Sequence, residues 1–118
     1  MKLTMEQQNK LIEKEKQKLL KLISEISDDK KELAERLIDR ISFMTITLEI
    51  LEDDIKEKGP TYLFEQGKQR MYVENPSQKS YNTMINRYNA ACNSFVNLLP
   101  KGNENSEDDG FLEFVTRR

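Results

Sequence analysis

Hydrophobic residues recur at the three- and four-residue spacing of α-helices over most of the chain. Residues 4–26 form the first such segment, which otherwise contains good helix formers such as Glu, Lys and Gln. Its apolar side consists of Ile12, Leu19, Ile23 and Ile26. The Ser27-Asp28-Asp29 sequence then predicts the end of this helix.

A second, longer helix is predicted over residues 29–58. We expect Asp29, with Glu32 three positions later, to cap its first turn, because a short carboxylate accepts hydrogen bonds from unpaired backbone amides. Gly59-Pro60 is expected to end the helix, since proline cannot continue the hydrogen-bond ladder.

Residues 59–75 contain the strand-like part of the sequence. Tyr62-Leu63-Phe64 and Met71-Tyr72-Val73 flank Gln66-Gly67-Lys68, which predicts a short hairpin or an ordered loop. Asn75-Pro76 then predicts a helix start, with asparagine as the N-cap and proline in the first helical position. This third helix is expected to end at about Leu99, before Pro100.

Two heptad stripes predict how the second and third helices pack. The stripe on the second helix consists of Ala34, Leu37, Ile41, Met44, Leu48, Leu51 and Ile55. The stripe on the third helix consists of Tyr81, Met84, Tyr88, Ala91, Phe95 and Leu98. Such stripes close into an antiparallel hairpin with knobs-into-holes packing, so we interpret these residues as core.

The predicted fold class is therefore all-α, with a short loop or β-hairpin inserted between the second and third helices. Three regions follow from it. Residues 1–27 form a Lys-rich N-terminal helix, residues 28–100 form a helical-hairpin oligomerisation core, and residues 101–118 form a flexible acidic tail with an apolar end.

The second helix carries a further apolar stripe of three residues, Phe43, Ile46 and Ile50, roughly opposite the heptad stripe. A helix that is apolar on two sides is buried on two sides. Either the first helix folds back over this second stripe, or a neighbouring subunit covers it. The second alternative makes the three residues part of an oligomer interface.

The third helix carries an asparagine row opposite its heptad stripe, formed by Asn82, Asn86, Asn89, Asn93 and Asn97. Asparagine is a mediocre helix former, so five on one face suggest that their amides have partners. Those partners can be an adjacent subunit or the phosphates and sugars of a nucleic acid. The alternative is a solvated face without a binding role.

Composition and charge exclude several classes of function. The 118 residues include no His and one Cys, so His-based catalysis, His-ligated metals and an intramolecular disulfide are excluded. No signal peptide or 18-residue apolar run is present, and we expect a cytoplasmic protein without a membrane contact. We therefore expect no enzymatic activity and no cofactor. We also expect no metal site, because the acidic clusters fit a solvated helix face.

A lysine row on the first helix is the candidate nucleic-acid contact. Lys10, Lys14, Lys18 and Lys21 recur at helical spacing on the side opposite its apolar residues. Such a row can follow a phosphate backbone, and an oligomer would multiply its weak individual affinity. A solvated face is the alternative interpretation. The next candidates for DNA contact are Lys68, Arg70, Lys79 and Arg87.

The region from Gly59 to Pro100 resembles the small subunit family of tailed-phage terminases. The likeness extends over residues 30–100: a long helix that ends near Gly59, an aromatic loop with Gly67, the Glu74-Asn75-Pro76 helix start, and a helix that carries Tyr81 and Tyr88 before Leu98-Leu99-Pro100. The N-terminal helix-turn-helix that many members of this family carry has no counterpart here.

The resemblance implies a non-catalytic component of viral genome packaging in the cytoplasm of the bacterial host. Its members assemble into homo-oligomeric rings, bind phage double-stranded DNA, and regulate the large terminase subunit, which holds the ATPase and nuclease. The family's C-terminal region is thought to engage that large subunit. This implies a docking role for four apolar tail residues, Phe111, Leu112, Phe114 and Val115.

Two alternatives stay open. The apolar end of the tail can instead pack against the helical hairpin of its own chain. The whole protein can also be a coiled-coil adaptor or structural protein without a nucleic-acid role, in which the Lys and Glu faces only confer solubility.

Overall fold

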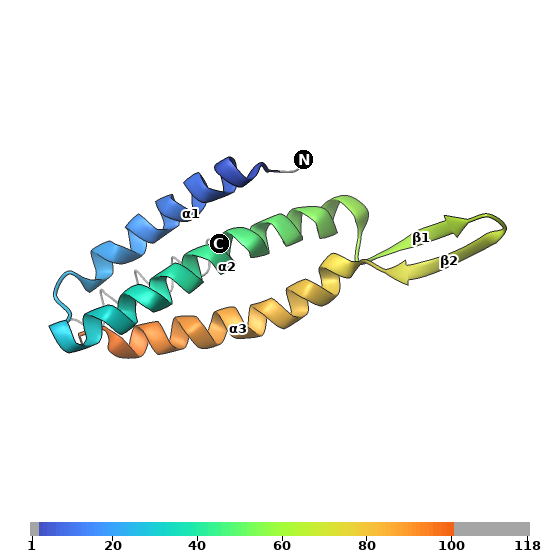
Figure 1. Cartoon of the computed structure of the whole chain (residues 1–118). Coiled ribbons are helices and arrows are strands. Elements are labelled where there is room, and N and C mark those ends of the chain that lie inside the picture. The colour runs from blue at the N-terminus through green and yellow to red at the C-terminus, as the bar shows by residue number, and fades with distance from the viewer. Residues whose placement is uncertain (1–2, 101–118) are drawn as a thin grey trace.

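The structure, a computed structural model that describes residues 3–100, contains three helices and a two-stranded antiparallel sheet (Figure 1). α1 (Met5–Leu20) continues into a single 3-10 turn, η1 (Lys21–Ile23), and α2 (Asp28–Lys58) follows. β1 (Thr61–Gln66) and β2 (Gln69–Glu74) form a hairpin that projects from one end of the helices, and α3 (Pro76–Leu98) returns beside α2. Among these helices, none is long and apolar enough to cross a bilayer.

The core lies along the contact between α2 and α3. Ile41 and Leu48 of α2 and Tyr88 and Phe95 of α3 are fully buried, and most half-buried members of both stripes flank them. The predicted helical hairpin is therefore confirmed, and most of the predicted seam packs on this core. The half-buried Leu51 and Ile55 are not among the residues packed against it. Ile38 is also buried, because the contact face of α2 is wider than the strict heptad positions.

Polar contacts within the seam show how the two helices are aligned. The Thr45 hydroxyl donates a hydrogen bond to the Ile41 carbonyl at 2.8 Å, and its oxygen lies 3.4 Å from the hydroxyl of Tyr88. Further towards the sheet, the Tyr81 hydroxyl donates to Glu52 Oε2 at 3.0 Å. These two cross-helix contacts place α2 and α3 antiparallel along their whole length.

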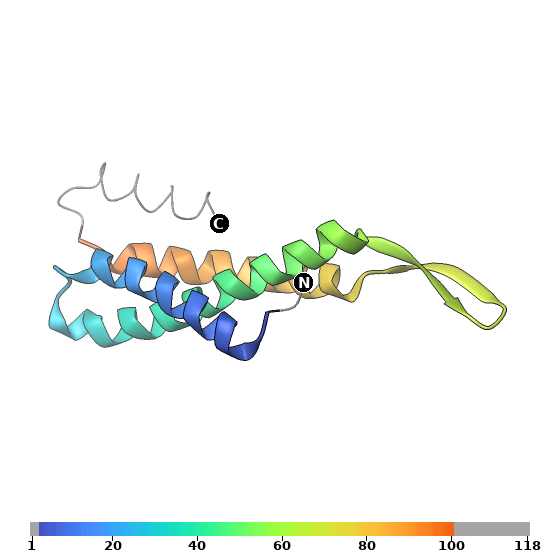
Figure 2. The same cartoon turned by 90° about the horizontal axis from the view of Figure 1, so that it is seen from above.

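The first helix folds back over α2, as the views in Figures 1 and 2 show. Leu19, Ile23 and Ile26 are buried in the same core cluster as the residues of the seam. Lys16 Nζ lies 3.1 Å from Asp39 Oδ1 and joins α1 to α2. α1 covers only the half of α2 that is far from the sheet.

Two local predictions at the α1–α2 connection were wrong. The α-helix ends at Leu20 rather than at residue 26, because the chain reverses direction there and its last turn tightens into η1. Helix α2 begins at Asp28 with Ser27 as its N-cap, so Asp29 already lies inside the first turn. The hydroxyl of Ser27 hydrogen-bonds the carboxylate of Asp29 and lowers its pKa.

The strand-like segment forms a hairpin rather than an irregular loop. Its register pairs Tyr62 with Val73 and Phe64 with Met71 across a two-residue turn at Gly67-Lys68. Gly67 has φ +60, a conformation that glycine adopts without strain at the first position of such a turn.

Candidate nucleic-acid and assembly surfaces

The lysine row lies on the outer side of α1 and η1. Lys10, Lys14, Lys18 and Lys21 are all exposed, whereas Leu19 on the opposite side is fully buried. Lys18 Nζ lies 3.2 Å from Glu15 Oε1 within the helix, and Lys18 keeps about half of its side-chain surface exposed in this pair. The structure therefore gathers the four residues on one accessible face.

Lys16 is not part of this face, although it lies between two members of the row in sequence. It points towards α2, where its hydrogen bond to the Asp39 carboxylate raises the pKa of the Lys16 ammonium. This lysine has a structural role in joining the helices.

The spacing of the lysine row suits a phosphate backbone. Residues four apart on a helix are separated by about 6 Å along the axis, and the whole row extends over about 16 Å. One strand of duplex DNA presents a phosphate for about every 3.4 Å of axis. Side chains as long as lysine can reach several phosphates from this row.

The asparagine row lies on the solvent side of α3, and all five members are exposed. Two of its amides have partners within the helix. Gln78 Nε2 donates to Asn82 Oδ1 at 2.8 Å, and Asn86 Nδ2 donates to the Asn82 carbonyl at 3.3 Å. The row is accessible to a neighbouring copy, to nucleic acid and to water alike.

The three residues of the second apolar stripe differ in their exposure. Ile46 is only 3% exposed within the single chain, and Asp39, seven residues before it on the same face, pairs with Lys16 of α1. Ile50 is half-buried, and Phe43 is 51% exposed. While α1 stays in place, Phe43 is thus the member of the stripe that is most available to a partner.

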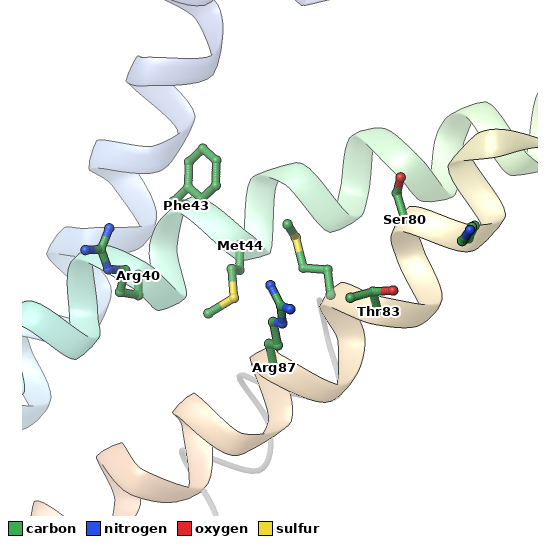
Figure 3. Close-up of a pocket in the computed structure, with 8 residues that line it drawn as sticks. Arg40, Phe43, Met44, Ser80, Thr83 and Arg87 are labelled. Carbon is green, nitrogen blue, oxygen red and sulfur yellow. The ribbon is translucent and has the colours of Figure 1, made fainter.

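Phe43 belongs to a groove of about 540 Å³ on the flank of the α2–α3 contact (Figure 3). We call it the basic groove. Arg40, Phe43 and Met44 of α2 line one side, and the other side is formed by residues of α3, namely Lys79, Ser80, Thr83, Met84 and Arg87.

The basic groove combines three cations with apolar side chains. Among residues 3–100, Arg40, Lys79 and Arg87 line it together with Phe43 and two methionines, and no acidic side chain does so. Within residues 3–100, no ion pair joins any of these three cations to a carboxylate. The groove is therefore suited to a ligand that is both anionic and apolar.

Sequence reasoning singled out Lys79 and Arg87 but did not place them beside Arg40 and Phe43. Heptad spacing predicts which residues face the seam. It does not predict which residues beside the seam become neighbours, because that depends on how far each helix is rotated about its axis. The other two secondary candidates lie on the hairpin, where Arg70 Nη2 pairs with Glu65 Oε1 at 3.1 Å across the strands.

The β-hairpin exposes apolar residues on both of its faces. Leu63 and Tyr72 form a cross-strand pair on one face, and Phe64 and Met71 form a pair on the other. All four are exposed, Tyr72 by 77%. A two-stranded hairpin without a covering layer is marginally stable in water, so these faces favour contact with another protein surface.

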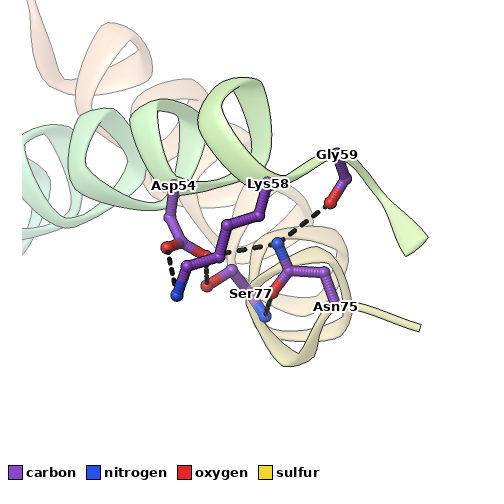
Figure 4. A network of polar contacts seen from close by, with 5 residues as sticks. All are labelled: Asp54, Lys58, Gly59, Asn75 and Ser77. Carbon is purple, nitrogen blue, oxygen red and sulfur yellow. Dashed lines mark hydrogen bonds and ion pairs between the residues drawn. The ribbon is translucent and has the colours of Figure 1, made fainter. Parts of the chain in front are cut away.

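A polar junction fixes the base of this hairpin (Figure 4). Asn75, which is only 2% exposed, accepts a hydrogen bond from the Ser77 amide and thereby caps α3, as predicted. Its Nδ2 group donates to the Gly59 carbonyl at 3.0 Å and to Asp54 Oδ2 at 3.2 Å. One side chain thus joins the end of α2 to the start of α3.

Asp54 is the anionic centre of the junction. Its carboxylate accepts a 2.6 Å hydrogen bond from the Ser77 hydroxyl and pairs with Lys58 Nζ at 3.2 Å. The Ser77 hydroxyl, then Lys58 and Asn75, hold the pKa of the Asp54 carboxyl below its ordinary value of 3.8. The ionised form of Asp54 is therefore the one that stabilises the junction.

The predicted docking residues Phe111, Leu112, Phe114 and Val115 lie outside the described residues. Neither a scan against models of protein families nor searches of curated proteins and of solved structures found a match for this chain.

Substituting Asn75→Ala should destabilise the protein by about 1–2 kcal/mol, the usual cost of losing a helix N-cap. The loss also leaves the Gly59 carbonyl without its amide donor. Urea unfolding followed by circular dichroism measures this difference. Asn93→Ala, which removes an exposed amide from the same helix, is the matched control and should change the unfolding free energy by less than about 0.5 kcal/mol. Equal effects of the two substitutions would refute the role of the junction.

Substituting Asp54→Asn should lower the urea midpoint at neutral pH and have less effect in acid. The contribution of a carboxyl with a lowered pKa is complete above the ordinary value of 3.8 and is lost as the pH falls through the pKa of the folded state. Urea midpoints of wild type and variant should therefore converge as the pH falls below 3.8 and through the pKa of the folded state. Asp53→Asn, next to it on the exposed side of α2, should show no such convergence.

Proposed function

We propose that this protein is the small subunit of a tailed-phage terminase, a non-catalytic homo-oligomer that binds viral double-stranded DNA and recruits the large ATPase and nuclease subunit. The order of elements in residues 30–100 is the basis of the family resemblance. In this proposal α1 contacts DNA, the hairpin contributes to assembly, and the apolar end of the tail docks on the large subunit.

The exposure of the whole lysine row is the observation that carries the DNA-binding part of this proposal. Four cations share one face of α1 and η1, and the apolar side of this segment packs in the core with α2. Contacts from a lysine row to phosphates add affinity without reading bases. We therefore expect binding with weak sequence discrimination and strong salt dependence.

The exposed hairpin supports the assembly part. Its apolar side chains are not covered by residues 3–100, and its unpaired strand edges can add a strand from another copy. Repetition of one lysine row around a ring would raise the effective concentration of DNA contacts.

The double variant Lys10→Ala and Lys14→Ala should weaken binding to duplex DNA of any sequence. Each lost phosphate contact should reduce the slope of log K against log salt concentration by about 0.9. Fluorescence anisotropy of labelled duplexes over a salt series measures both quantities.

The matched control for that experiment is Lys31→Ala with Lys56→Ala, which removes two exposed charges from α2. It should leave the slope unchanged. Equal slopes for both double variants would exclude α1 as the DNA contact. A wild-type protein that does not bind duplex DNA would instead favour the adaptor alternative.

Substituting Tyr72→Glu should reduce the assembled fraction, because it places a charge on the most exposed apolar residue of the hairpin. Native mass spectrometry at several protein concentrations measures the distribution of oligomers. Gln69→Glu, a charge added at an exposed polar position of the same strand, should have little effect. A wild-type protein that is monomeric throughout would refute assembly altogether.

A further inference from the structure

We infer that the basic groove binds the acidic and apolar C-terminal segment of the same chain, residues 104–115. The inference goes beyond the proposed function and does not depend on it, because it concerns the protein by itself, whereas the proposed function docks the same apolar tail residues on the large subunit. Both the chemistry of the groove and the reach of the chain support it.

The charges of the two partners are complementary. Arg40, Lys79 and Arg87 line the groove, and none of the described residues that line it is acidic. Residues 104–115 contain no basic residue, and they contain five acidic ones: Glu104, Glu107, Asp108, Asp109 and Glu113. Ion pairs at such a surface are individually weak, but a tethered segment needs only modest affinity, because its effective concentration is of the order of millimolar.

The apolar character of the groove distinguishes this segment from DNA. Half-exposed Phe43 and the methionines Met44 and Met84 line it. A phosphate backbone gains little from such apolar side chains, whereas aromatic and aliphatic side chains bury apolar surface against them. The segment brings suitable side chains directly after its acidic residues, in Phe111, Leu112, Phe114 and Val115.

The reach of the chain is sufficient. The contact between Thr45 and Tyr88 puts Phe43 and Met44 close to the level of α3 at which Arg87 lies. From Arg87 to Pro100 the helix and its cap extend over about 20 Å. Ten extended residues reach about 33 Å, so the chain after Pro100 can turn back along α3 and bring Phe111 to the groove.

The chain has no tryptophan, so Phe114→Trp in the full-length protein gives a single fluorescent reporter. Its emission should be blue-shifted relative to the same protein in denaturant, because the indole leaves water for the groove. Charge reversal in the groove by Arg40→Glu with Arg87→Glu should return the emission to the denatured position. Lys14→Glu with Lys21→Glu makes the same charge change on the outer side of α1 and should leave the blue shift intact.

A charge swap makes the test independent of any loss of folding. Adding Asp108→Lys and Asp109→Lys to the groove variant should restore the blue shift, with circular dichroism confirming equal helix content. Emission at the denatured position in the parent protein, or a blue shift that charge reversal does not change, would overturn the inference. A blue shift that is lost on dilution would also overturn it, since the tail would then come from another copy.

DNA is the competing ligand. If the groove variant loses DNA binding while the emission stays blue-shifted, the groove is a DNA site and the inference fails. The lysine-row variants test DNA binding by α1 separately. Tail binding in the groove and DNA binding by α1 can therefore each be refuted without affecting the test of the other.

Discussion

The packing of α2 against α3 is the constraint on which the other surfaces depend. Tyr88 and Phe95 lose all their exposed surface in this contact. Removing a buried aromatic side chain of this kind costs about 3–5 kcal/mol, a large share of the roughly 5–15 kcal/mol by which a typical domain is stable. α1 packs against the core that α2 and α3 form, through Leu19. The basic groove likewise exists only because the two helices meet in one alignment, set by Thr45 with Tyr88 and by Tyr81 with Glu52.

Some charged side chains join elements of the fold, and others face solvent, according to the direction in which each one points. Lys16 faces α2 and pairs with Asp39, whereas the lysine row on the same helix faces solvent. Asp54 likewise joins elements at the base of the hairpin, where it accepts hydrogen bonds from Ser77 and Asn75 and pairs with Lys58. The basic groove differs from both cases, since its cations lie beside apolar side chains and not beside carboxylates of residues 3–100. A nearly neutral chain thus presents local faces of distinct chemistry.

Features with a strong local signal could be predicted from the sequence. The seam follows from heptad spacing, and the start of α3 follows from Asn75-Pro76, because asparagine and proline each suit one backbone position there. Features that depend on tertiary placement could not be predicted. Nothing local distinguishes Ile46, which is buried, from Phe43, which is half exposed. The cap of α2 was misplaced from Ser27 to Asp29 since Ser and Asp are almost equally good N-caps. The groove was missed because Arg40 and Arg87 lie 47 positions apart and meet only through the rotation of two helices.

The attachment of the hairpin has a geometric consequence for any assembly built through it. Six paired residues extend about 20 Å from their anchor, so a tilt of about 5° at the base displaces the tip by nearly 2 Å. The hydrogen bonds of Asn75 and the backbone of Gly59, with φ +86, set that tilt. In a closed assembly built through the hairpin tips, this angle would determine the curvature. It would thereby determine how many copies complete the circle, although the residues that set it lie far from the contacting tips.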